Sequence, residues 1–106
     1  MAKYLVQVNY TAEGAKGVIR DGGSKRRSAA QAAAESLGGR LECLYFALGK
    51  TDAFVIADMP DNVSVAALGM ALAASGAMQS HTTVLLTPEE MDQAAKKAPA
   101  YRAPGQ

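Results

Sequence analysis

The sequence predicts an α+β fold of the ferredoxin-like type, with a four-stranded antiparallel sheet, two main helices on one face and an extra C-terminal helix. The first observation is the order of segments along the chain, which is strand, helix, strand, strand, helix, strand, helix. The first six form the split βαβ pattern, in which two right-handed crossovers put both helices on one face. The second observation is the length of 106 residues, enough for one modest core. We therefore expect one domain over residues 1–98 and a flexible tail over residues 99–106.

The first strand is predicted over residues 3–10, where Val and Tyr are concentrated. Thr11 is suited to cap the helix that follows, because its side chain can accept a hydrogen bond from a free backbone amide. Asp21-Gly22-Gly23 interrupts that helix after about residue 20. A second helical segment is expected over residues 24–37, since it is rich in alanine and is followed by Gly38-Gly39.

A hairpin is predicted in the middle of the chain. Apolar residues 41–48 and 53–58 form its strands, and the turn between them runs from Gly49 to Asp52. Glycine can adopt positive φ, and an aspartate side chain can accept hydrogen bonds from backbone amides near a turn. The turn is therefore predicted to set the register of the hairpin, with a ligand-binding or catalytic Asp52 as the less favoured alternative.

The second half of the chain has clear helix start signals. Asp61 is suited to cap a helix over residues 62–75, and a strand is predicted over residues 78–86. Thr87 is followed by Pro88 and, three residues after the cap, by Glu90. That spacing is typical of a capping box with proline at the first helical position, so a last helix is expected to end near residue 97.

Composition excludes several classes of function. The formal net charge is +1, with 49% hydrophobic and 20% charged residues, so the chain has no overall field that would attract nucleic acid or an acidic membrane. The basic run Lys25-Arg26-Arg27 could bind a phosphate or an acidic partner, but it lacks interleaved aromatic residues and is interpreted as a solvated helix face. No apolar run is long enough to span a bilayer, and none resembles a secretory signal. We expect a cytoplasmic protein without nucleic-acid or membrane partners.

The cysteine and histidine content argues against metal or disulfide chemistry. Cys43 is the only cysteine, so no internal disulfide is possible, and no Cys/His cluster has metal-ligand spacing. We therefore expect no metal site and no cofactor. Cys43 could be a nucleophile if a cation lay beside it, but its nearest cation in sequence, Arg40, would point to the opposite face of a regular strand. Cys43 is therefore interpreted as a small hydrophobic side chain.

Three stretches resemble the GYD domain family of small bacterial proteins. They are "YTAEGAKGV" after the first strand, "AESLGGRLECLYFALG" through the second and "DAFVIADMPDN" after the turn, and the resemblance covers about Lys3 to Glu90. It implies a ferredoxin-like fold related to the dimeric α/β-barrel proteins, in which two sheets face each other, and it implies no particular reaction. At the turn, the family pattern has an aromatic residue just before Asp52, where this chain has Thr51.

Side chains alternate between the two faces of a strand, so each strand offers two sets. The bulkier or more apolar sets are assigned to the face under the helices: Tyr4, Val6 and Val8; Leu44, Phe46 and Leu48; Phe54 and Ile56; Thr82, Val84 and Leu86. The open face then receives Leu5, Gln7, Asn9, Leu41, Cys43, Tyr45, Ala47, Ala53, Val55, Ala57, His81, Thr83 and Leu85. Because Leu5, Leu41, Val55 and Leu85 would leave apolar surface in water, we expect a homodimer or a higher multiple that stacks the open faces.

The polar residues of the open face are the candidate site. His81 is the only histidine, and an imidazole is the side chain best suited to general base catalysis at neutral pH, so it is the candidate catalytic base, with a purely structural histidine as the alternative. Gln7, Asn9, Tyr45 and Thr83 are the candidate ligand-binding residues, since a cavity between two sheets would be lined by them.

Three functions are consistent with the sequence. The first is a binding protein for a small, partly apolar metabolite. The second is a cofactor-free enzyme of the isomerase or monooxygenase type that uses His81, which rests on fold analogy alone. The third is a structural or assembly protein without a ligand. A polar-lined cavity would favour the first two, and a dry packed interface would favour the third.

Overall fold

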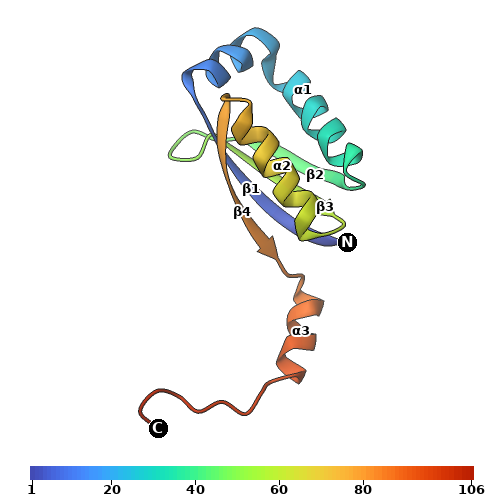
Figure 1. The fold of residues 1–106 in the computed structure, drawn as a ribbon, viewed down its shortest axis with the longest axis vertical. Helices are drawn as coiled ribbons and strands as arrows, with labels where there is room; N and C mark the ends of the chain where they lie inside the picture. The colour runs from blue at the N-terminus through green and yellow to red at the C-terminus, as the bar shows by residue number, and fades with distance from the viewer.

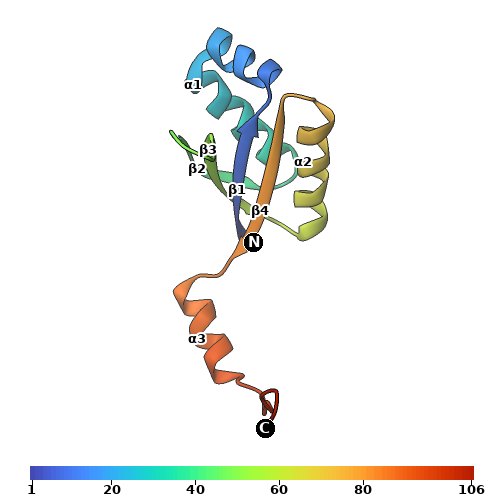
Figure 2. The same cartoon turned by 90° about the vertical axis from the view of Figure 1, so that its left-hand side faces the viewer.

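The computed structural model of the protein describes residues 1–106 and has seven regular elements (Figure 1). In chain order they are β1 (Ala2–Tyr10), α1 (Ala12–Ser36), β2 (Arg40–Phe46), β3 (Ala53–Met59), α2 (Asn62–Ala74), β4 (Met78–Leu85) and α3 (Pro88–Lys96). The strands form one antiparallel sheet in the order β2-β3-β1-β4. Figure 2 shows α1 and α2 on the same side of that sheet. The predicted ferredoxin-like arrangement, with its extra C-terminal helix, is confirmed.

The predicted helix starts are confirmed at the hydrogen-bond level. The side chain of Thr11 accepts a bond from the Gly14 backbone N–H at the start of α1, and Asp61 accepts one from the Ser64 N–H at the start of α2. At the start of α3, Thr87 makes the reciprocal capping box, because the side chain of Glu90 also accepts from the Thr87 N–H. These bonds satisfy amides that the first turn of a helix otherwise leaves free.

Helix α1 consists of two helical segments joined at a kink. Gly22 has φ of 78° at the kink, a left-handed conformation that glycine adopts without steric cost. The next residue, Gly23, lies so close to Phe46 that an added Cβ would be 3.0 Å from the ring. The predicted interruption at residues 21–23 is therefore correct, and it sets the direction in which the alanine-rich second segment crosses the sheet.

Strand β1 presents its faces as predicted, and so does β4 up to its end at Leu85, beyond which Leu86 is exposed. Strand β2 does so from Cys43 to Phe46, and β3 does not. Cross-strand partners share a face, and β1 buries Tyr4, Val6 and Val8 under the helices. Their β3 partners are the residues Ala57, Val55 and Ala53, which therefore face the helices as well. The assignment of these three residues to the open face was wrong. Their neighbours Phe54 and Ile56 lie on the open face, opposite Gln7 and Leu5 of β1.

A β-bulge in β2 explains the error for that strand. The pairing of β2 with β3 shifts between Leu41 and Cys43, so Glu42 is one extra residue. The extra residue reverses the alternation along the strand, and Leu41 faces the helices together with Leu44. The assignment of Leu41 to the open face was therefore wrong, whereas Cys43 and Tyr45 do lie there. Strand β2 also ends at Phe46, so Leu48 lies beyond it and is fully exposed.

The core under the helices is split into two clusters. One contains Tyr4, Ala34, Ala57, Met59 and Val65, and the other contains Val6, Val8, Ala53 and Met78. A small domain usually has one contiguous core, so the division indicates incomplete packing between the two helices and the middle of the sheet.

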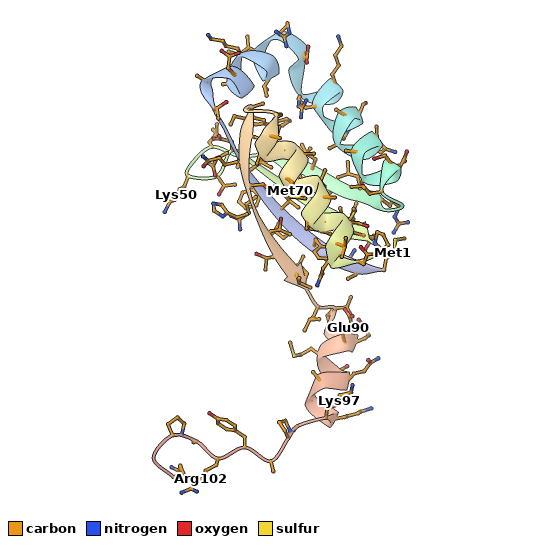
Figure 3. The ribbon with its side chains drawn as sticks, in the orientation of Figure 1. Met1, Lys50, Met70, Glu90, Lys97 and Arg102 are labelled. Atoms are coloured by element: carbon orange, nitrogen blue, oxygen red, sulfur yellow. The ribbon has the colours of Figure 1, made fainter.

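Helix α3 does not pack against the sheet or the other helices. Figures 1 and 2 show it beyond the end of β4, away from the sheet and the other helices. The radius of gyration is 16.8 Å, whereas a compact chain of this length is expected to have about 13 Å. Every residue from Pro88 to Gln106 is exposed. Figure 3 shows Glu90, Lys97 and Arg102 along this arm.

The turn after β2 is tied to the end of β1. The Asp52 backbone N–H donates to the Val8 carbonyl at 2.9 Å, and the Asp52 carboxylate accepts from the Tyr10 N–H at 2.8 Å. The Asn9 side chain donates to the Lys50 carbonyl at 2.6 Å. Gly49 has φ of 145°, which is unfavourable for other residues. These contacts fit the structural role predicted for the turn.

Asp52→Ala is expected to lower the free energy of unfolding by about 1–2 kcal/mol, because the Tyr10 N–H would lose its partner. Urea denaturation measures this change. Lys50→Ala is the control, since Asn9 contacts only the backbone carbonyl of Lys50 and the Lys50 side chain points away from the sheet and helices (Figure 3). Equal stability of the Asp52 variant and the native protein would contradict the structural role.

Candidate functional site

The open face of the sheet is built from three rows of side chains that run across the strands. In the order β4, β1, β3, β2, the rows are His81, Gln7, Phe54 and Tyr45; then Thr83, Leu5, Ile56 and Cys43; then Leu85, Lys3, Asp58 and Arg40. Side chains within a row are cross-strand neighbours and can touch.

The middle of the open face is apolar. Tyr45 and Phe54 form a cross-strand aromatic pair and are 70% and 37% exposed. Ile56 and Leu5 continue the apolar surface in the next row and are half-buried. Phe54 and Ile56 are the apolar members of this surface that the sequence interpretation missed. The pairing register reveals them, because they stand opposite Gln7 and Leu5.

An ionic cluster closes one end of the open face. Asp58 is buried, and its two carboxylate oxygens accept hydrogen bonds from the Lys3 ammonium and the Arg40 guanidinium, each at 3.0 Å. Lys3 also pairs with Glu42, the extra residue of the bulge. The hydrogen bonds from Lys3 and then Arg40 lower the pKa of Asp58 below its ordinary 3.8. The hydrogen bonds that Lys3 donates to Glu42 and then to Asp58 raise the pKa of Lys3. The cluster was not predicted, since its members come from three strands.

The predicted site residues fall into two groups on this face. Gln7, Asn9, His81 and Thr83 lie together on the adjacent strands β1 and β4, where Gln7 is opposite His81. Tyr45 lies on β2, at the other edge of the sheet. Three strand spacings separate it from His81, about 14 Å. One protomer therefore does not bring Tyr45 and His81 to the same small ligand.

Two of these residues also have structural partners. Gln7 accepts a hydrogen bond from the Thr51 hydroxyl at 3.3 Å, and Asn9 donates to the Lys50 carbonyl. His81 and Thr83 are exposed, and neither side chain is hydrogen-bonded within the chain. Because β4 is an edge strand, His81 also borders a groove between β4 and α2. The polar groups free to contact a ligand on this half of the face are therefore those of β4.

The family model of the GYD domain matches residues 4–95, nearly the whole chain. The chain belongs to the GYD domain family. The match includes the open face and most of α3, so both are parts of the GYD domain in this chain. No curated protein and no solved structure shows significant similarity to the chain. None of its helices is both long and apolar enough to cross a membrane.

Asp58→Asn is expected to lower the free energy of unfolding at neutral pH by about 1–2 kcal/mol, because the hydrogen bonds from Lys3 and Arg40 lose their ionic character. The folded-state pKa of Asp58 is lowered, so its contribution is complete above the ordinary 3.8 and is lost as the pH falls through the folded-state value.

Urea titrations at neutral pH and well below pH 3.8 measure this difference. The free energies of unfolding of the native protein and the variant should differ at neutral pH and become equal in acid. Asp92→Asn on the exposed α3 is the matched control and should change neither value. A difference that persisted unchanged in acid would show that the ionised carboxylate is not the source of the stabilisation.

Proposed function

We propose that this GYD domain protein is a homodimer whose two open faces stack, and that the cleft between them binds a small, partly apolar molecule beside His81. The observation that carries the proposal is the helix-free face, with its apolar centre and its polar edge on β4. Soluble monomers rarely expose a contiguous apolar surface of this kind.

A second copy of the chain is the partner that fits this face best. In a two-fold dimer the same patch meets itself, so its charges must be self-complementary. The ionic cluster has two cations and two anions, from Lys3, Arg40, Glu42 and Asp58, and is balanced. A strongly acidic or strongly basic partner would gain little electrostatic attraction from such a balanced patch.

The C-terminal arm gives a second reason for self-association. Met91, Ala94 and Ala95 form an apolar stripe at helical spacing on α3, opposite its charged residues. A helix of nine residues is marginal in water unless its apolar side is covered. The arm leaves the domain directly after Leu85 of the open face, so a stacked partner would lie within its reach.

The ligand site is assigned to the β4 half of the cleft. Ligand sites combine apolar surface with a few polar groups, and here Leu5 and Ile56 adjoin His81 and Thr83. The imidazole can donate or accept a hydrogen bond near neutral pH, and the hydroxyl can do both. None of the ion pairs of the chain involves His81, so we favour binding over catalysis by this histidine.

Ile56→Lys is expected to convert the dimer to a monomer, because it would bury unpaired charge at the centre of the stacked faces. Light scattering at micromolar concentration measures the mass. Val63→Lys, at an exposed apolar position on α2, is the matched control and should leave the dimer intact. A monomeric native protein would contradict the proposal.

A fragment screen tests the ligand site. We expect small aromatic alcohols and amides that bind the dimer to shift the NMR signals of His81 and Thr83. The substitution His81→Ala is expected to weaken the binding of these fragments about tenfold, roughly the effect of one lost hydrogen bond. Thr82→Ala, one residue away on the other face of β4, is the control. If the dimer forms but no fragment reaches these residues, the interface is dry and the assembly role is correct instead.

A further inference from the structure

A cavity of about 110 Å³ lies on the other side of the sheet, between the strands and the helices α1 and α2. Fifteen of its 16 lining residues are hydrophobic. The second segment of α1 contributes Ala29, Ala30, Ala33 and Ala34, whose short side chains leave the space open. The cavity adjoins both core clusters, since Ala34 and Ala57 belong to one and Val6 and Met78 to the other.

Arg26 is the only charged residue that lines this cavity. It stands on α1 four residues before Ala30 and seven before Ala33, so it belongs to the inward stripe of the helix. Its Nε atom is buried and has no hydrogen-bond partner in the chain. The interpretation of residues 25–27 as a solvated helix face is therefore wrong for Arg26.

No acidic side chain neutralises Arg26. It also borders a second hollow, which is lined by Glu13 and Asp21, but Glu13 pairs with Lys16 and Asp21 with Arg20. A guanidinium is always charged in a protein, and a buried donor left unpaired is costly. The buried Nε–H of Arg26 therefore has no acceptor within the chain.

We propose that this cavity binds a small apolar carboxylic acid, whose carboxylate pairs with Arg26 and whose hydrocarbon part lies among the alanines of α1 and the strand residues below. A dry apolar cavity of about 150 Å³ is known to accept benzene. A space of 110 Å³ therefore suits one ring or a short branched chain. The single cation suits a monoanion, and the start of the second α1 segment after Gly22 favours the same sign of charge. This site is separate from the proposed cleft, which lies on the opposite face of the sheet.

Benzoate is the probe, and benzamide is its uncharged control of the same shape. In a titration of the full chain followed by methyl NMR, benzoate should shift Val6, Leu44 and Leu72 of the cavity and leave Leu5 and Ile56 of the open face unchanged. Benzamide should bind at least about tenfold more weakly, because it lacks the charge that pairs with Arg26.

Arg26→Met should weaken the binding of benzoate about tenfold or more and leave the affinity for benzamide unchanged, since methionine keeps an apolar stem but lacks the guanidinium. Arg27→Met, on the exposed side of the same turn, is the matched control and should bind benzoate like the native protein. Ala33→Leu should fill the cavity and abolish binding of both probes, with thermal melting showing that each variant is folded.

Three outcomes would overturn the proposal. They are absence of benzoate shifts in the cavity, equal affinity for benzoate and benzamide, or unchanged benzoate affinity in Arg26→Met. The Ile56→Lys variant separates this proposal from the dimer, because a monomer should still bind benzoate when only the stacked interface is lost.

Discussion

The position of β1 in the middle of the sheet is the constraint on which the rest of the structure depends. β1 is paired with β3 on one side and β4 on the other, so its alternation is imposed on both neighbours. Val6 and Val8 point under the helices, and Leu5 and Gln7 point to the open face. The cavity and the candidate dimer surface are therefore the two sides of one alternating strand. A shift of one residue in this register would exchange them.

Most of the fold could be predicted because its signals are local. The order of strands and helices gave the topology, since a split βαβ chain has few alternatives. The caps at Thr11, Asp61 and Thr87 use a side chain and an amide only three residues apart, so their sequence spacing contains the whole interaction. The faces of β1 and β4 were also correct, since neither strand contains an irregularity.

The remaining features depend on contacts between distant residues. The bulge at Glu42 is stabilised partly by Lys3, 39 positions away, and no local pattern marks it. In β3, Phe54 and Ile56 are larger than Ala53 and Ala57, so size alone suggested the wrong face. The helices approach the sheet closely enough that small residues fit beneath them, and Ala53 and Ala57 are 1% and 4% exposed. Arg26 was also misassigned, because the sequence of a basic run does not reveal which of its members points inward.

The small size of the core links the two sides of the sheet energetically. Only 11 of the 106 residues are buried, and the alanines of α1 supply little apolar area. Small domains bury a low fraction of their surface and depend on additional contacts for stability. A molecule in the cavity would connect the two core clusters from one side, and a second protomer would cover Leu5 and Ile56 from the other. Any ligand that binds only the folded state raises its stability. Each event would therefore raise the stability of the same small domain, from opposite sides of β1.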